Sequence, residues 1–132
     1  MNDKFKIHRP FSPAIGQYQI PIQLINEINE YVELVNKNNK LKDELDHGKS
    51  LAGEVSQEIR ITKEFLNKGL LKFLGHSVEN YIKLSAGKNI KTFKLIAAWV
   101  VGQFKNEYNP AHWHGGHISG VAYLKLPDSF GD

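Results

Sequence analysis

Three of the six histidines in this 132-residue chain fall within six consecutive positions, the segment His112-Trp113-His114-Gly115-Gly116-His117. Side chains at positions i and i+2 of an extended backbone project to the same side. His112 and His114 are therefore predicted to hold one divalent metal ion together, with His117 as a reserve ligand. Imidazole is a common protein ligand of zinc, copper and iron. An incidental cluster of surface histidines fits the same spacing, so both interpretations stay open.

Other catalytic chemistries lack the residues that they need. A catalytic histidine requires an orienting carboxylate, and Glu107 is the nearby candidate in the sequence. The sequence contains no serine nucleophile elbow, no glycine-rich phosphate loop and no HExxH helix. It also contains no cysteine, which excludes disulfides and thiolate ligands. Any metal must therefore be held by imidazole and carboxylate groups.

Two predicted strands flank the histidines and must position them. Residues Leu95 to Phe104 form an almost unbroken apolar run, which indicates a strand. Residues Ile118 to Leu126 alternate between apolar and polar side chains, the pattern of a half-buried strand. The pair Gly115-Gly116 predicts a tight turn between the two.

Helical spacing dominates the first part of the chain. Apolar residues recur every three or four positions from Ile22 to Asn36, which predicts an amphipathic helix. The same spacing returns between Ile61 and Leu84, where Gly69 weakens the pattern and Ser77 could cap a second piece.

Less regular segments precede and separate these helices. Residues Ala14 to Ile20 predict an extended segment, closed by a proline. Residues Lys40 to Gln57 are polar and predict a long loop, with a helical turn near Leu41 to Leu45. His47 in this loop is interpreted as a surface histidine.

These elements predict a single α+β domain over residues 1–132, with its helices packed on one side of an antiparallel sheet. Residues 1–89 form the mainly helical part. Residues 90–132 form the β part that carries the histidine cluster. Because the sequence ends just after the turn that begins at Pro127, the domain is expected to be incomplete.

The overall composition is that of a soluble globular protein, with 41% hydrophobic and 23% charged residues. No apolar run approaches the ~20 residues of a membrane span, and the N-terminus lacks a signal-peptide pattern. A cytoplasmic protein without a membrane partner is expected. The net charge is +3, but no nucleic-acid-binding motif accompanies the basic residues, so nucleic acid is not an expected partner.

The segment Asn106-Glu107-Tyr108-Asn109-Pro110-Ala111-His112-Trp113-His114 is followed by Ser119-Gly120-Val121-Ala122-Tyr123-Leu124 and Pro127. This arrangement resembles the signature N-x-Y-x-x-x-x-H-x-H and S-G-V-x-Y-L-x-x-P of a bacterial and phage family of 2-oxoglutarate- and iron(II)-dependent oxygenases. The resemblance implies a double-stranded β-helix, or jelly roll, of which the predicted sheet would be the first part. It also implies hydroxylation-type oxidation of an unknown substrate.

The resemblance extends to individual site residues. His112 matches the first metal ligand, and His114 stands where the commonest pattern has a carboxylate. Tyr123 matches a strand position that can hydrogen-bond the cosubstrate 2-oxoglutarate. An imidazole at His114 leaves the site with one less negative charge and a weaker hold on hard metals.

Two family residues have no counterpart in this sequence. No histidine follows His117, and no arginine follows Arg60, so the distal metal ligand and the arginine that binds the 2-oxoglutarate carboxylate are missing. The chain is therefore expected to be a truncated fragment that lacks turnover.

Two further interpretations stay open besides the oxygenase. The chain could be a cupin-like module that binds a metal or small ligand without catalysis, or a structural protein with incidental histidines. In the oxygenase interpretation, part of a barrel would leave strand edges and the apolar faces around Trp99 and Val121 uncovered. A homodimer or larger assembly is therefore expected.

Overall fold

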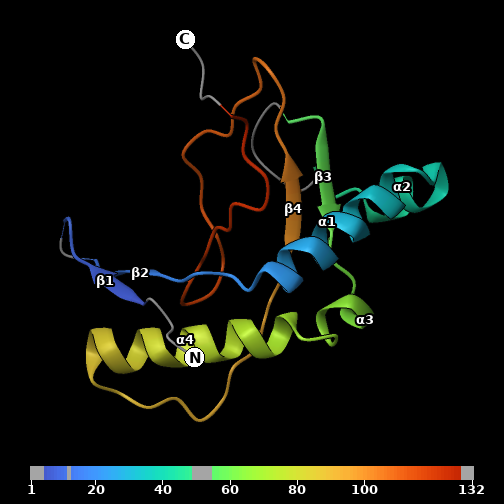
Figure 1. Cartoon of the computed structure of the whole chain (residues 1–132). Helices are drawn as coiled ribbons and strands as arrows, with labels where there is room; N and C mark the ends of the chain where they lie inside the picture. The colour runs from blue at the N-terminus through green and yellow to red at the C-terminus, as the bar shows by residue number, and fades with distance from the viewer. Residues whose placement is uncertain (1–4, 12, 49–54, 129–132) are drawn as a thin grey trace. The chain divides into compact units, whose positions relative to one another are not determined.

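The computed structural model describes residues 5–11, 13–48 and 55–128 (Figure 1). Its fold is α+β, with helices and small antiparallel sheets, which confirms the predicted class. The chain divides into two compact units, and each combines two segments that are separated in the sequence. The first unit comprises Met1–Leu24 and Ile61–Ala98, and the second comprises Ile25–Arg60 and Trp99–Asp132.

In the first unit, an antiparallel hairpin of β1 (Lys6–His8) and β2 (Ile15–Gln17) is fixed to helix α4 (Leu70–Ala86). The hydroxyl of Tyr18, just after β2, donates a hydrogen bond of 2.8 Å to the carbonyl of Ser77 in α4. In the opposite direction, the hydroxyl of Tyr81 in α4 donates a bond of 2.7 Å to the carbonyl of Ala14. The extended segment predicted over residues 14–20 therefore forms, with its regular strand limited to β2.

The helical stretch predicted from residue 61 to residue 84 is divided into α3 (Lys63–Leu66) and α4. The division falls at Gly69, whose φ of 131° is a conformation that residues with a side chain rarely adopt. The sequence suggested Ser77 as a helix cap, but Ser77 does not cap a helix. It lies inside α4, where its hydroxyl donates a bond of 2.9 Å to the carbonyl of Phe73.

The second unit contains most of helix α1 (Ile22–Asn36), whose bounds are those predicted from its apolar spacing. Ile28 and Val35 are buried on one face of this helix, with 5% and 1% of their surface exposed.

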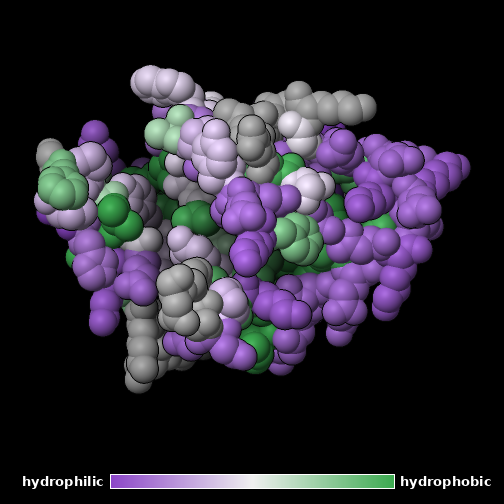
Figure 2. Space-filling model, turned by 90° about the horizontal axis from the view of Figure 1, so that it is seen from above, coloured by the Kyte–Doolittle hydropathy of each residue, from purple (hydrophilic) through white to green (hydrophobic). Residues whose placement is uncertain are grey.

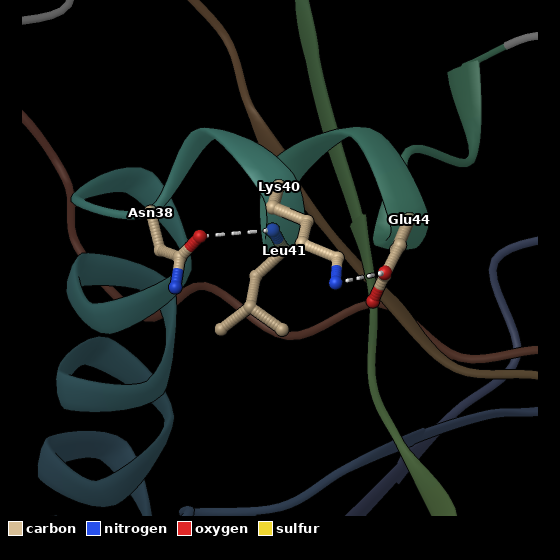
Figure 3. Close-up of polar contacts among 4 residues, drawn as sticks. All are labelled: Asn38, Lys40, Leu41 and Glu44. Atoms are coloured by element: carbon tan, nitrogen blue, oxygen red, sulfur yellow. Dashed lines mark hydrogen bonds and ion pairs between the residues drawn. The ribbon is translucent and has the colours of Figure 1, made fainter.

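Helix α2 (Asn39–Leu45) follows α1 and begins with a side-chain cap (Figure 3). The side-chain oxygen of Asn38 accepts a bond of 3.2 Å from the backbone N–H of Leu41. Lys40 and Glu44 form an ion pair of 4.0 Å on the exposed side, where such pairs contribute little. Hydrophilic side chains dominate this part of the surface, on the right of Figure 2.

The strands β3 (Gln57–Arg60) and β4 (Trp99–Gly102) pair in antiparallel fashion, with Glu58 opposite Val101 and Arg60 opposite Trp99. Because side chains alternate along a strand, these four residues share one face of the pair. Ile59, which is 2% exposed, points to the other face.

Two hydrogen bonds join helix α1 to strand β3. The hydroxyl of Tyr31 donates to the carbonyl of Arg60 at 2.8 Å, and the side-chain amide of Gln57 donates to Asn36 Oδ1 at 2.7 Å. Since Gln57 shares the face of Ile59, this attachment explains why Ile59 is buried.

Two strand predictions need correction. The strand predicted from Leu95 to Phe104 is limited to β4, and residues Ile118 to Leu126 form no strand. In that segment the apolar positions include Gly120 and Ala122, which offer little side-chain surface to bury. Among the residues that the structure describes, both sheets have two strands, so neither extends into the jelly-roll sheet that the resemblance implies.

Several large apolar side chains are exposed, and apolar atoms reach the surface in Figure 2. The most exposed are Phe11, Ile96, Trp113 and Val121, at 87%, 70%, 98% and 81%. Within the described ranges, no helix has the length and apolar character needed to cross a membrane.

Candidate metal centre

The structure brings His112 and His114 together at their Nε2 atoms, which lie 3.0 Å apart. Their rings meet edge to face, with centroids 4.6 Å apart. On its other side, Nδ1 of His112 lies 2.6 Å from the carbonyl oxygen of Pro110. A carbonyl can only accept a hydrogen bond, so Nδ1 of His112 donates the proton and its Nε2 presents a lone pair.

The separation of the two Nε2 atoms suits shared coordination of a metal ion. Two metal–imidazole bonds of about 2.0–2.1 Å that meet at a right angle or slightly more place their nitrogens about 3 Å apart. The observed 3.0 Å matches this value. Without a metal it is the length of a hydrogen bond, in which the N–H at Nε2 of His114 donates to Nε2 of His112. Metal-bound histidines also commonly donate their second ring N–H to a carbonyl or carboxylate, as His112 does to Pro110.

Trp99 on strand β4 packs against the histidine pair. The centroid of its ring lies 5.6 Å from that of His114. The same indole lies 5.2 Å from the ring of His47. His47 is held by two bonds: its backbone N–H donates to the carbonyl of Glu58 at 2.9 Å, and its Nδ1 accepts from Arg60 at 3.2 Å. His47 was predicted to be a surface histidine, and the structure places it at the surface with one side half-buried against Trp99.

Two carboxylates lie next to this group of rings. Glu58 on strand β3 is 5% exposed, and Asp46 precedes His47. A side chain built at Gly48 would begin 3.2 Å from Asp46 Oδ1 and 3.3 Å from Glu58 Oε2, so both carboxylates face one small space. Burial raises the pKa of Glu58, the Asp46 charge raises it further, and the His112 charge acts in the opposite direction.

The other predicted site residues are not joined to the pair. Tyr123 is 69% exposed and His117 is also exposed. In the part of the chain that the structure describes, no hydrogen bond or ring contact links either residue to His112 or His114. Within the same residues, no three His, Asp or Glu side chains converge on one point as they stand.

Glu107 does not orient a histidine, although the sequence offered it for that role. Its carboxylate accepts the backbone N–H of Phe104 at 2.9 Å and that of Ser56 at 3.1 Å. These bonds close a turn in which Asn106 has a φ of 69°, a conformation that asparagine tolerates better than most residues. Glu107 therefore fixes the chain between β4 and the histidines.

Because of its hydrogen bonds with Ser56 and with the backbone of Phe104, the pKa of Glu107 lies below its usual value. A lowered pKa in the folded state contributes stability above the unfolded-state value of about 4.3, and this contribution is lost as the pH falls through the folded-state pKa. We expect Glu107→Gln to reduce stability at pH 6 and to matter progressively less below pH 4. Urea unfolding of both proteins across this range measures the difference, and a difference that stays constant with pH would contradict the assignment.

Sequence reasoning missed strand β3 and with it Glu58, because residues 40–57 were interpreted as a loop and the following helix was placed from residue 61. One signal was present. Ile59 and Ile61 alternate with Glu58 and Arg60, which is the two-residue period of a strand.

In chemical terms, the described site offers two imidazoles at chelating distance, a supporting indole and a buried carboxylate nearby. Such a set can bind a divalent cation and leave coordination positions open. Comparison of the chain with protein-family models, curated proteins and solved structures finds no match.

Proposed function

We propose that this chain binds a divalent transition metal through His112 and His114, as the metal centre of an iron(II)- and 2-oxoglutarate-dependent oxidation. The observation that carries the proposal is the 3.0 Å separation of the two Nε2 atoms. The bond from His112 Nδ1 to Pro110 strengthens it, because this bond leaves the His112 lone pair at Nε2.

The oxidation chemistry is supported by the sequence pattern around the two histidines. Iron(II) would supply open positions for 2-oxoglutarate and dioxygen, and Tyr123 would donate a hydrogen bond to the 2-oxoglutarate. The proposal includes the jelly-roll core of the oxygenases that the motif resembles. The substrate class is a small molecule or side chain that can be hydroxylated.

Titration with cobalt(II), followed by its visible absorption, tests the metal site. We expect binding by the unmodified chain and an affinity at least about tenfold lower in His112→Ala and in His114→Ala. His8→Ala is the matched control, because His8 is exposed on β1 in the first unit. Equal affinity in the double variant His112→Ala/His114→Ala would refute the site.

A metal-binding module without catalysis is the second candidate, favoured by the 69% exposure of Tyr123, the residue proposed to bind 2-oxoglutarate. The two candidates differ in their response to 2-oxoglutarate. In an oxygenase-type centre, 2-oxoglutarate should change the spectrum of the bound cobalt, even when no succinate is released. An unchanged cobalt spectrum at saturating 2-oxoglutarate would favour the simple binding module.

Self-association, predicted from the sequence, is part of the proposal. Its support is the exposure of Trp113 and Val121, at 98% and 81%, in the segment that carries the histidines. Light scattering at micromolar protein concentration should give a mass above that of one 15.0 kDa chain. A mass of one chain would refute it.

A further inference from the structure

The charged residues are divided unequally between the two units of the chain. The first unit, Met1–Leu24 and Ile61–Ala98, has ten Lys or Arg and three Asp or Glu, a net charge of +7. The second unit has seven Lys or Arg and eleven Asp or Glu, a net charge of −4. The net charge of +3 for the whole chain therefore conceals one strongly basic unit and one acidic unit.

In the first unit, two hydrogen bonds join the turn of the β1–β2 hairpin to the last turns of α4. The guanidinium of Arg9 donates to the carbonyl of Ser85, and the hydroxyl of Tyr81 donates to the carbonyl of Ala14. Figure 1 shows the hairpin beside the C-terminal part of α4, drawn in yellow. We call this region, residues 6–11, 13–15 and 81–88, the basic end.

The basic end contains cations and no acidic residue. Its exposed cations are Lys6, Arg9, Lys83 and Lys88. The sequence has no Asp or Glu from residue 4 to residue 26 or from residue 80 to residue 106. The described lysines that pair with a described carboxylate within 4.0 Å are Lys37 and Lys40, both in the second unit. The positive charge of the basic end is therefore available to an anionic partner.

Large apolar side chains are exposed among these cations. Phe11 at the hairpin turn is 87% exposed, and Ile15 and Leu84 are 54% and 59% exposed. Phe11 follows Arg9 by two residues, and Leu84 follows Lys83 directly. At the left of Figure 2, hydrophobic and hydrophilic side chains lie side by side. The partner of this surface should therefore offer both negative charge and an apolar phase.

We propose that the basic end docks on the surface of a lipid bilayer that contains anionic lipids. Its cations would attract the headgroups, while Phe11 and Leu84 would enter the boundary between the headgroups and the acyl chains. A nucleic acid would attract the same cations, but the aliphatic Ile15 and Leu84 cannot stack on bases and gain nothing beside a phosphate backbone. The exposed aliphatic side chains therefore favour lipid.

Docking of this kind takes place at the bilayer surface and requires no membrane-spanning segment. It adds a partner that the sequence did not predict. The inference is independent of the proposed metal centre, because His112 and His114 belong to the second unit.

Co-sedimentation of the full chain with vesicles tests the role of the cations. The chain should bind vesicles of equal parts phosphatidylserine and phosphatidylcholine, and a lack of binding to them would refute the inference. We expect Lys83→Gln and Lys88→Gln each to lower the affinity about fivefold. Lys105→Gln removes the same charge from an exposed position of the second unit and should lower it less than about twofold, because distant exposed charges are screened. Equal losses in all three variants would also refute the basic end.

Phe11→Ala tests the apolar contribution in the same assay. It should lower the affinity for the anionic vesicles at least about tenfold, because the ring no longer enters the bilayer. Phe11→Leu keeps an apolar side chain and should retain most of the affinity. Phe104→Ala is the matched control, because Phe104 is 59% exposed in the second unit. If Phe11→Ala bound as tightly as the unmodified chain, the inference would be wrong.

Competition with double-stranded DNA separates lipid from nucleic acid as the partner. DNA is added to the vesicle-bound chain at a phosphate concentration equal to that of the phosphatidylserine. We expect most of the chain to stay on the vesicles, because DNA offers no apolar phase for Phe11 and Leu84. Complete displacement by DNA would overturn the inference and identify the basic end as a nucleic-acid surface.

Discussion

Replacing Trp99 with alanine is expected to lower the free energy of unfolding by about 3 kcal/mol, near the low end for tryptophan-to-alanine changes because the side chain is half-buried. The indole lies against two rings, those of His47 and His114, at 5.2 and 5.6 Å. Its loss should therefore also loosen the histidine pair and weaken cobalt binding. Urea unfolding and cobalt titration measure the two effects separately.

Trp113 provides the matched control, because it lies between His112 and His114 in the sequence and is 98% exposed. Trp113→Ala should change the free energy of unfolding by no more than about 0.5 kcal/mol. Trp99→Phe keeps an aromatic ring on β4 and should lose less stability than Trp99→Ala. Similar losses for the exposed and the half-buried tryptophan would show that the ring contacts of Trp99 contribute little.

Ile59→Ala is expected to have the largest effect on the second unit, a loss of about 2–5 kcal/mol in the free energy of unfolding. Ile59 is 2% exposed on the face of β3 to which α1 is attached, so a smaller side chain would leave a cavity. A loss of this size is a large part of the stability of a small protein. Thermal and urea unfolding, followed by the helical circular-dichroism signal, measure it.

Two control variants show whether the loss in Ile59→Ala depends on the burial and size of the side chain. Ile59→Val removes one methyl group and should cost about 0.5–1.5 kcal/mol. Ile96→Ala changes an isoleucine that is 70% exposed and should stay within about 0.5 kcal/mol. If Ile59→Ala and Ile96→Ala destabilised the chain equally, the burial of Ile59 would not determine the stability of the unit.

The sequence predicted the elements whose signals are local. The bounds of α1 follow from apolar residues at helical spacing along Ile22–Asn36. This spacing can be recognised within the segment itself, without knowledge of its partners. The strands were harder to predict, because a strand is stabilised by a partner that is distant in sequence. Strand β3 has four residues and pairs with β4 about forty positions later, whereas residues Ile118 to Leu126 alternate well but form no strand.

The candidate site shows the same division. The proximity of His112 and His114 follows from their spacing of two residues, and the structure places their Nε2 atoms together. Nothing local connects them to Glu58 or His47, which reach the region through the pairing of β3 with β4 and the contacts of Trp99. Tyr123 was predicted as a site residue from its position in a sequence motif. A motif match does not predict whether the side chain is buried or exposed.

The contact between Trp99 and His114 also gives the protein an intrinsic optical reporter. Indole fluorescence is quenched by a nearby protonated imidazole and by many bound transition metals. The ring centroids of Trp99 and His114 are 5.6 Å apart, which is close enough for such quenching. The chain has two tryptophans, so in a Trp113→Phe variant all indole emission would come from Trp99. The state of the histidine pair could then be followed during unfolding, acidification or metal exchange by the emission of one residue, without any added dye.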